Sequence, residues 1–276
     1  MKLKRLSLLV LGSVLVTLGS WQRAVALPYA AEVLSDSPIA YWRFDETSGS
    51  IATDSAGSND GTWIGASQGN GSATPGLGKA AGFDGTSSRI NVPALGSATN
   101  LSIEAWFRAS NLPAVGNWMV LYDTQFFGAT ALHWQLFTNG ASQTVNEFAL
   151  GFSDTNNTFA FSQDTWYYIV GTYDNTAGTG QLYVNGVLVE TLFTGAPPHT
   201  TNLLVADIGA WVPAGTPFRV FDGLIDEVAI YGSTLSPARI AAHYEAAFAS
   251  VPEPGSLALL GAALAGFGLS RRKPNQ

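Results

Sequence analysis

The sequence contains no cysteine in its 276 residues. This absence excludes disulfide bonds, thiolate metal ligands and cysteine nucleophiles, so a folded domain here must be held together by its hydrophobic core. Charged residues are also scarce, at 12%, whereas aromatic residues make up another 12% and glycine occurs 30 times. Such a composition is typical of an all-β protein with many tight turns.

Basic residues are few between the two ends of the chain. Seven of the 13 lie in the end segments (Lys2, Lys4, Arg5, Arg23, Arg271, Arg272 and Lys273), which leaves six in Leu27–Ser250. Glu253 is the only one of the 20 acidic residues outside that central part, so six basic and 19 acidic residues give it a formal charge of −13. A surface this acidic repels phosphate backbones and excludes nucleic acid as a partner, but it is compatible with divalent cations and neutral sugars.

The first 26 residues have the three parts of a secretory signal peptide. Basic residues begin the segment, an apolar helical run follows at Leu6–Leu18, and Ala24 and Ala26 supply the small residues of a cleavage site. An uncleaved membrane anchor is the alternative, which the shortness of the run disfavours. We therefore predict export of the chain across the inner membrane.

The last 26 residues combine a motif, an apolar stretch and a basic end. Pro252, Glu253 and Pro254 precede an apolar helix at Gly255–Leu269, and Arg271, Arg272 and Lys273 follow it. This order resembles the PEP-CTERM sorting signal of Gram-negative bacteria. The resemblance implies an exosortase-type protease that removes a membrane-embedded tail and delivers the protein to the cell surface or extracellular matrix. A plain C-terminal anchor is the alternative.

The chain accordingly divides into a signal peptide (1–26), one folded domain (27–250) and a sorting tail (251–276), and both ends would associate transiently with the membrane. Within the domain, Trp166–Glu190 predicts a three-stranded antiparallel meander, because Asn185-Gly186 suits a type I′ turn. Leu101–Arg108 alternates between an apolar and a polar face. Further strands are predicted at 40–44, 62–64, 80–83, 89–92, 118–122, 131–137, 147–152, 158–161, 203–208 and 223–231.

One helix is expected, at Pro237–Phe248, with Ser236 as its N-cap and Pro237 in its first turn. Strands at this spacing without long helical periods predict one antiparallel β-sandwich. Four phrases then resemble the LamG-like, concanavalin A-type jelly-roll domains: Ala40–Glu46, Ser102–Phe107, Trp166–Gly186 and Phe221–Tyr231. The resemblance implies two antiparallel sheets, often a bound calcium ion, and commonly glycan binding or adhesion.

Asp226 is the carboxylate for which a metal role is predicted. Strict alternation in 224–231 places it on a buried face with Val228, where a carboxylate needs a partner. One alternative is a structural partner such as backbone N–H groups or Arg43. The other is calcium, by resemblance to calcium-binding members of the family, with Asp84 as the preferred second ligand. Asp54, Asn59 and Asp60 form a competing oxygen-rich cluster in a loop.

Aromatic residues are the candidates for contact with a sugar. In β-sandwich lectins, Trp and Tyr side chains of loops stack on the C–H faces of sugars, and four aromatic residues lie near loops or variable strands: Trp118, Tyr122, Trp134 and Trp211. Three other tryptophans, Trp42, Trp106 and Trp166, belong to the family phrases and are expected in the core. Packing in the core or at its rim is the alternative for each of the four candidates.

Catalysis is not expected. Glucanases of this broad fold carry two carboxylates on one face of a strand, whereas alternation places Asp226 and Glu227 on opposite faces, and Glu104 is the only carboxylate on its strand. The three histidines are scattered, and no catalytic motif occurs. We therefore predict a non-catalytic protein of the cell surface that binds a polysaccharide or glycoprotein. A matrix or adhesion protein with a protein partner, and a polysaccharide hydrolase or lyase, are the alternatives.

Overall fold

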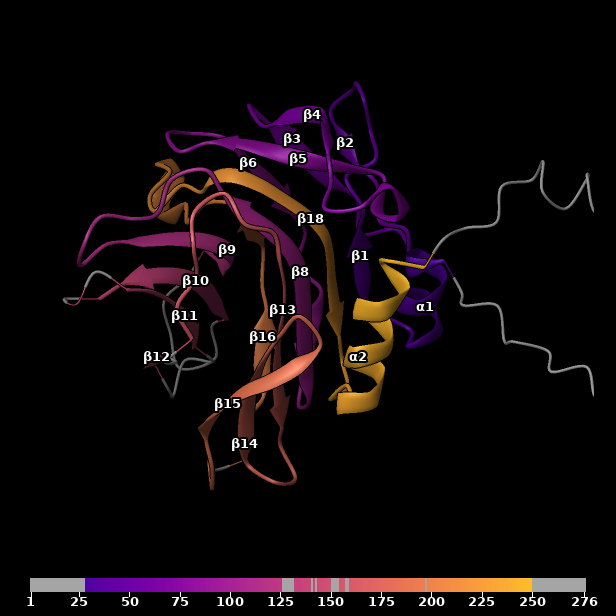
Figure 1. Ribbon diagram of the computed structural model, residues 1–276, viewed down its shortest axis with the longest axis vertical. Helices are drawn as coiled ribbons and strands as arrows, with labels where there is room; N and C mark the ends of the chain where they lie inside the picture. The colour runs from indigo at the N-terminus through magenta and orange to yellow at the C-terminus, as the bar shows by residue number, and fades with distance from the viewer. Residues whose placement is uncertain are drawn as a thin grey trace, which may run out of the picture.

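The computed structural model describes residues 28–125, 132–139, 141, 143–149, 154–156, 159–196 and 198–249 (Figure 1). The predicted signal peptide (1–26) and sorting tail (251–276) lie outside these residues, as do parts of the strands predicted at 131–137, 147–152 and 158–161. Among the described helices, none has both the length and the apolar character needed to cross a membrane.

The first sheet has the strand order β15-β14-β13-β8-β18-β5-β4, and β1 also pairs with β18. All of its pairings are antiparallel. Its strands are β1 (Ala40–Trp42), β4 (Ser67–Gly71), β5 (Lys79–Asp84), β8 (Leu101–Ala109), β13 (Tyr167–Asp174), β14 (Thr179–Val184), β15 (Val187–Phe193) and β18 (Asp222–Tyr231).

The second sheet has the order β12-β11-β10-β9-β17-β6-β3-β2 and is antiparallel as well. Its strands are β2 (Ile51–Ala52), β3 (Gly61–Ile64), β6 (Arg89–Val92), β9 (Trp118–Thr124), β10 (His133–Thr138), β11 (Thr144–Ala149), β12 (Asp154–Asn156) and β17 (Ala206–Ile208). Two further strands, β7 (Gly96–Ala98) and β16 (Thr201–Leu203), form a separate pair. The predicted two-sheet antiparallel sandwich is thus confirmed.

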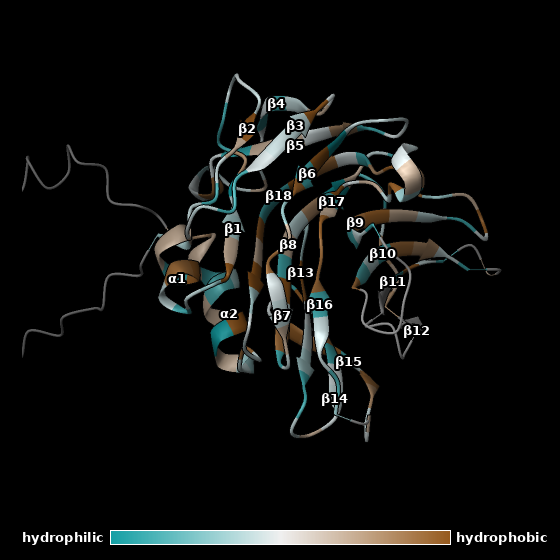
Figure 2. Cartoon of the chain, turned by 180° about the vertical axis from the view of Figure 1, so that it is seen from behind, coloured by the Kyte–Doolittle hydropathy of each residue, from teal (hydrophilic) through white to brown (hydrophobic). Residues whose placement is uncertain are grey.

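The predicted meander is β13-β14-β15, and its tight turn is left-handed at both central residues, with φ of 52° at Asn185 and 80° at Gly186. These are the backbone angles of a type I′ turn, which explains the Asn-Gly pair. Hydrophobic residues concentrate on the strands, whereas the loops are more hydrophilic (Figure 2).

The main hydrophobic core fills the space between the two sheets. The alternation predicted for β8 is confirmed, because Ile103 and Phe107 point into this core together with Leu121 and Leu136 of the opposite sheet. Trp106 of the same strand points to the other side of the first sheet, where it is 2% exposed beneath the helices. Burial of two such clusters supplies the main driving force for folding.

Two helices cover the outer face of the first sheet. α2 (Pro237–Ala246) is the predicted helix, and the Ser236 hydroxyl accepts a hydrogen bond from the N–H of Arg239 at 3.3 Å. α1 (Tyr29–Ser35) was not predicted, since seven residues are too few to show a helical period. The helices are joined by Arg239, which pairs with Glu32 at 2.6 Å and Asp36 at 2.8 Å.

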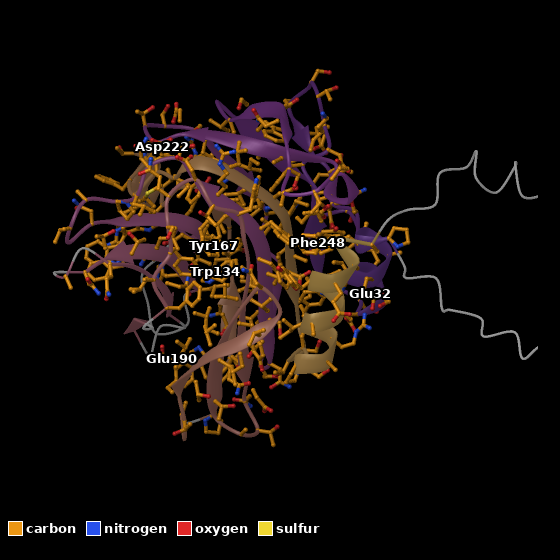
Figure 3. All side chains as sticks on the ribbon, in the orientation of Figure 1. Glu32, Trp134, Tyr167, Glu190, Asp222 and Phe248 are labelled. Carbon is orange, nitrogen blue, oxygen red and sulfur yellow. The ribbon has the colours of Figure 1, made fainter. Side chains whose placement is uncertain are left out.

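The described chain begins at α1 and ends just after α2, so both of its ends lie on one side of the sandwich (Figure 1). The loop that leads into β18 lies on the opposite side. Figure 3 shows this separation, with Asp222 at the start of β18 far from Glu32 and Phe248. The end of the described chain beside α2 and the loops described next therefore lie on different sides of the sandwich.

Candidate functional site

A short hairpin between β17 and β18 forms part of the rim of the sandwich. Trp211 and Phe218 face each other across it and exchange two backbone hydrogen bonds, of 2.9 and 2.7 Å. A 3-10 turn, η2 (Pro213–Gly215), closes the hairpin, and Gly215 supplies a φ of 87°. The N–H of Phe221 donates to the carbonyl of Gly209 at 2.7 Å within the hairpin, and the N–H of Gly209 donates to the carbonyl of Leu121 in β9 at 3.1 Å, which ties the hairpin to the second sheet.

Arg219 follows the hairpin and lies against two tryptophan rings. Its guanidinium carbon is 4.4 Å from the ring centroid of Trp118 and 5.2 Å from that of Trp211. Both distances are those of cation–π contacts. The backbone of Arg219 is left-handed, with φ of 50°, and its carbonyl accepts a 2.8 Å hydrogen bond from the N–H of Val120. The side chain donates to Gln135 Oε1 at 2.9 Å.

We call Trp118, Trp211, Phe218 and Arg219 the rim site. Together with Gly85, Asn117 and Val220 they line a pocket of about 450 Å³. The two tryptophans are half-buried, and the ring of Phe218 is 51% exposed. Aromatic faces at a solvent-exposed pocket can stack on the C–H face of a sugar, and the guanidinium can donate hydrogen bonds to its oxygens.

The structure divides the four predicted ligand-binding aromatics into two pairs. It brings Trp118 and Trp211 together in the rim site, although they are distant in the sequence. Tyr122 and Trp134 are cross-strand partners inside the inter-sheet core, and both are 0% exposed. Figure 3 shows Trp134 in the interior of the molecule. Their burial contradicts the prediction that they contact a ligand. Proximity to loops did not reveal which face of its strand each residue occupies.

Sequence reasoning missed Phe218 and Arg219. A signal for the hairpin was present, because Pro213, Gly215 and Pro217 lie close together between two aromatic residues. No signal in the sequence indicates that Arg219 adopts a left-handed backbone or that it meets a tryptophan from β9. Both facts depend on which strands become neighbours.

Asp84, one predicted calcium ligand, lies in an exposed turn after β5. Its carboxylate accepts hydrogen bonds from the N–H groups of Thr86, Ser87 and Ser88 at 2.8 to 3.1 Å and from the Ser88 hydroxyl at 2.8 Å. These bonds, that from the Ser87 N–H above all, hold the pKa of Asp84 well below its ordinary value. The carboxylate thus has a structural role in the turn.

Asp226 is not a neighbour of Asp84. The register of β5 and β18 pairs Asp84 with Asp222, four residues before Asp226, which is roughly 13 Å along a strand. The two carboxylates therefore cannot ligate one ion. Within the described residues, no group of three or more His, Asp and Glu side chains is arranged to hold a metal ion. Calcium binding at either residue stays a prediction that this pairing does not support.

The competing cluster around Asp54 is also a structural turn. Its carboxylate, which is 4% exposed, accepts 2.9 Å hydrogen bonds from the N–H groups of Tyr41, Ala56 and Asn59. The N–H of Asp54 in turn donates to Asp60 at 2.8 Å. These bonds order the long loop beside β1, which explains the polar composition of the loop.

The predicted placement of Asp226 and Glu227 on opposite faces of a strand was wrong. β18 contains a bulge after Asp226, and Glu227 is left-handed with φ of 53°. Asp226 lies opposite Trp106, and Glu227 bonds the hydroxyl of Tyr41, both of which belong to the core beneath the helices. An extra residue resets the alternation of a strand, so both carboxylates share this side.

Glu104, Asp226 and Glu227 form what we call the buried carboxylate cluster, and each is fully buried. Asp226 accepts from the Ser72 hydroxyl, and Arg43 pairs with Glu227 at 3.5 Å rather than with Asp226. Burial raises the pKa of Glu227 to about 8 despite the charge of Arg43. Burial, and then the charge of Glu227, raise the pKa of Asp226 well above its ordinary value.

Glu104 connects the cluster to α2. It accepts hydrogen bonds from the hydroxyls of Tyr168 and, at 2.8 Å, Tyr231, and from His243 Nδ1 at 2.9 Å. The other ring nitrogen of His243 contacts Asp36 at 2.9 Å. Burial disfavours the charged imidazolium, but Glu104 and Asp36 outweigh this effect and raise the pKa of His243. His243 therefore joins the sheet to both helices.

These pKa shifts predict that stability falls as the pH rises from 5 to 8. The folded pKa of Glu227, about 8, exceeds the ordinary value of 4.5, so its contribution is full below pH 4.5 and is lost through pH 8. The raised pKa values of Asp226 and His243 act in the same direction. We expect Glu227→Gln to reduce the slope of the free energy of unfolding against pH, by up to about 1.4 kcal/mol per pH unit. Urea unfolding at pH 5, 6.5 and 8 measures this, and equal slopes in both proteins would contradict it.

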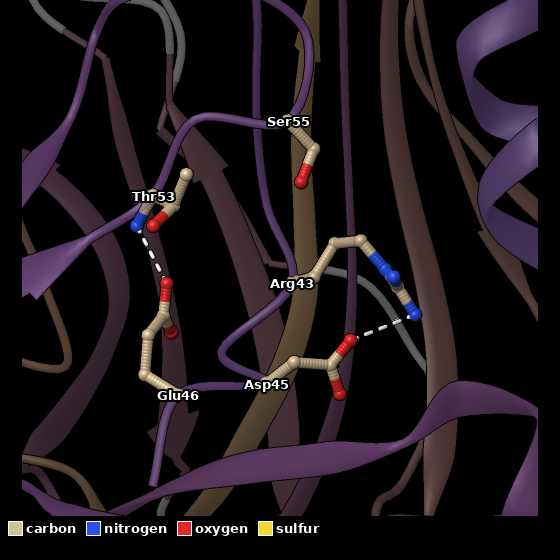
Figure 4. A pocket seen from close by; sticks show the side chains of 5 residues that line it. All are labelled: Arg43, Asp45, Glu46, Thr53 and Ser55. Carbon is tan, nitrogen blue, oxygen red and sulfur yellow. Dashed lines mark hydrogen bonds and ion pairs between the residues drawn. The ribbon is translucent and has the colours of Figure 1, made fainter. Parts of the chain in front are cut away.

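A second pocket, of about 320 Å³, lies beside β1 and is lined by Arg43, Asp45, Glu46, Thr53 and Ser55 (Figure 4). Its charged groups already have partners within the protein. Arg43 pairs with Asp45 at 2.9 Å, and Glu46 accepts a hydrogen bond from the backbone N–H of Thr53 at 2.7 Å. A ligand here would compete with these bonds. The rim site, with its exposed aromatic ring, is the stronger candidate.

Comparison with known structures supports the architecture. Domain 4 of AbnA, an extracellular GH43 arabinanase from Geobacillus stearothermophilus solved with arabinotriose, is 23% identical with a TM-score of 0.56, over 75% of this chain and 98% of that one. The Trypanosoma rangeli sialidase is 16% identical with a TM-score of 0.52, over 74% of this chain but only 32% of the sialidase. At these identities the likeness shows the fold alone. Among curated proteins, none matches this sequence.

Two family profiles match the sequence. The PEP-CTERM protein-sorting motif matches residues 250–273, which include the predicted Pro252, Glu253, Pro254, Arg271 and Arg272. This match indicates export and surface sorting in a Gram-negative-type bacterium and implies processing by an exosortase. The second profile matches residues 84–241, more than half of the chain and most of the sandwich. The chain therefore belongs to the concanavalin A-like lectin/glucanases superfamily.

Proposed function

We propose that this protein is a surface-sorted, non-catalytic module that binds a glycan through the rim site. The observation that carries the proposal is the meeting of Trp118, Trp211 and Phe218 with Arg219 at one pocket. Aromatic rings bind the apolar faces of sugars, and a guanidinium orients the sugar by hydrogen bonds. The hairpin that carries Trp211 and Phe218 is held by backbone hydrogen bonds, so little order has to be gained on binding.

Burial of the acidic groups supports binding without catalysis. Hydrolysis of a glycosidic bond needs two carboxyl groups that reach the substrate. Five carboxylates of the described strands are at most 1% exposed and do not reach a substrate at the surface: Glu104, Asp123, Asp207, Asp226 and Glu227. Asp123 and His133 bond each other at 2.6 Å in such a buried position.

The placement of the rim site suits presentation to the surroundings of a cell. The sorting tail follows α2, and the rim site lies on the other side of the sandwich (Figures 1 and 3). If the tail were held in a membrane, the rim site would face away from that membrane. The arabinanase domain of similar fold was solved with arabinotriose, which supports the choice of a glycan as the proposed ligand.

Two phenylalanines of similar exposure provide the test. Phe218 is 51% exposed in the rim site, and Phe248 is 57% exposed beside α2. A glycan array on the full mature chain first selects a ligand, and calorimetry then measures affinity. We expect Phe218→Ala and Trp211→Ala each to weaken binding about tenfold or more, and Phe248→Ala to leave it within about twofold.

Three results would contradict the proposal. The first is equal loss of affinity in Phe218→Ala and Phe248→Ala, since it would place the ligand away from the rim site. The second is release of reducing sugar or of unsaturated products, which would favour a hydrolase or lyase. The third is binding only to a surface protein after its glycans are removed, which would favour an adhesion protein.

A further inference from the structure

Arg219 differs from the other arginines of the domain in having no acidic partner among the residues that the structure describes. Arg43 pairs with Asp45 and Glu227, Arg89 with Asp207, Arg108 with Asp164, and Arg239 with Glu32 and Asp36, at 2.6 to 3.5 Å. Among the described residues, no carboxylate lies within 4 Å of the Arg219 guanidinium, although acidic residues outnumber basic ones about threefold in this part of the chain.

The donors of Arg219 remain largely available for a ligand. A guanidinium has five N–H donors, and in the described part of the chain Arg219 makes one side-chain hydrogen bond, to Gln135. Its contacts with the rings of Trp118 and Trp211 use the π systems and consume no N–H group. These contacts and the bond to Gln135 fix the orientation of the guanidinium, which stays half-exposed in the pocket.

Two acidic residues lie near Arg219, one beside the pocket and one close in the sequence, and both already accept hydrogen bonds from other groups. Asp84, next to the lining residue Gly85, accepts four hydrogen bonds from its own turn. Asp222, three residues after Arg219, accepts from Asn111 Nδ2 at 2.6 Å. The positive charge at the rim site is therefore not neutralised by an adjacent ion pair, and it is held beside aromatic surface where a ligand is partly desolvated.

Resting on the proposed glycan-binding function, we propose that the rim site selects glycans that carry an anionic group, with Arg219 as the residue that determines this specificity. A planar guanidinium offers two parallel N–H groups to a carboxylate or sulfate, and such charge-assisted bonds are about twice as strong as neutral ones. The shared ligand chemistry is an oxyanion on a sugar ring, supplied by a uronic acid or by a sulfate ester.

The acidic surface of the domain makes this selection testable. A formal charge of −13 opposes unspecific adsorption of polyanions, so a preference for an anionic glycan must come from a local site. Two matched pairs of probes separate the sources of charge: galacturonan oligosaccharides against their methyl esters, and dextran sulfate against dextran. The full mature chain is titrated with each probe by calorimetry at 0.15 M salt.

We expect the wild type to bind the charged member of at least one pair ten- to hundredfold more tightly than the neutral member. Arg219→Gln should weaken binding of the charged member much more than binding of the neutral member, which brings the two affinities within about twofold of each other. Arg219→Lys should keep part of the preference. Arg108→Gln removes the same charge from a half-exposed arginine outside the pocket and should retain the full preference.

The outcomes distinguish this inference from the proposed function. An unchanged preference in Arg219→Gln, or wild-type affinities that do not differ between charged and neutral probes, would overturn the role of Arg219 while glycan binding itself stands. A wild type that binds no glycan would overturn the proposed function as well. Circular dichroism and the melting temperature confirm that each variant is folded.

Discussion

Replacing Glu104 with glutamine is expected to lower the free energy of unfolding by about 3–5 kcal/mol at pH 7. The Glu104 carboxylate is fully buried and accepts hydrogen bonds from two tyrosines and from His243. An amide has one acceptor oxygen and carries no charge, so the substitution leaves the buried ring of His243 with Asp36 as its one acidic partner among the described residues. Urea unfolding monitored by tryptophan fluorescence measures the change.

Glu227→Gln is the matched control for this experiment. Both carboxyl groups are fully buried on the same side of the first sheet, but the pKa of Glu227 is raised to about 8, so it is mostly protonated at pH 7. We expect the control to change stability by less than about 1 kcal/mol. A similar loss in both variants would show that burial alone, and not the hydrogen bonds of Glu104 with His243 and the two tyrosines, is responsible.

A milder variant covers the case in which Glu104→Gln does not fold. Tyr231→Phe removes one hydroxyl that donates to Glu104 and should cost about 1 kcal/mol. Glu104 and His243 should also be coupled, so the double variant Glu104→Gln, His243→Gln is expected to lose less than the sum of the single losses. Additive losses would contradict the role of Glu104 as the anchor of α2.

Gly223→Ala is expected to destabilise the protein by at least about 4 kcal/mol or to prevent folding. Gly223 lies between β5 and β8 with φ of 143°, where an L-residue is strained. A Cβ at this position would lie 2.1 Å from the backbone oxygen of Arg108 and 2.8 Å from the backbone nitrogen of Ser110. Both atoms belong to the main chain at the end of β8, so no side-chain movement relieves the clash.

Gly71→Ala is the control for the backbone effect. Gly71 ends β4 with no left-handed φ, and a Cβ there meets no atom within 4 Å. We expect a change of no more than about 0.5 kcal/mol. Melting temperatures of both variants provide the comparison, and a Gly223→Ala protein as stable as the wild type would contradict the close approach of β18 to β8. The variant also tests the rim site, since Gly223 begins the strand that follows the hairpin.

The buried carboxylate cluster and the rim site occupy different sides of the molecule and have different roles. The cluster holds α1 and α2 on the first sheet, next to the segments predicted to direct export. The rim site depends on the second sheet and on the hairpin before β18. Replacing Glu104 should therefore reduce the amount of folded protein, whereas substitutions in the rim site should change affinity.

Local patterns in the sequence determined a large part of the architecture. The Asn185-Gly186 turn, the alternation of β8 and the Ser236 cap each depend on neighbours within a few residues, so they could be predicted without knowing the fold. The sorting motif is contiguous and was found for the same reason. Trp118 and Trp211 could be named as candidates because they lie near predicted loops.

Tertiary structure alone decided which residues meet and which side of a strand they occupy. The bulge after Asp226 moved Glu227 to the side of its neighbour, because one extra residue reverses a period of two. The pairing of Asp84 with Asp222, the burial of Tyr122 and Trp134, and the position of Arg219 against two tryptophans depend on strand register. Register is set by contacts between residues far apart in the chain, which no local pattern contains.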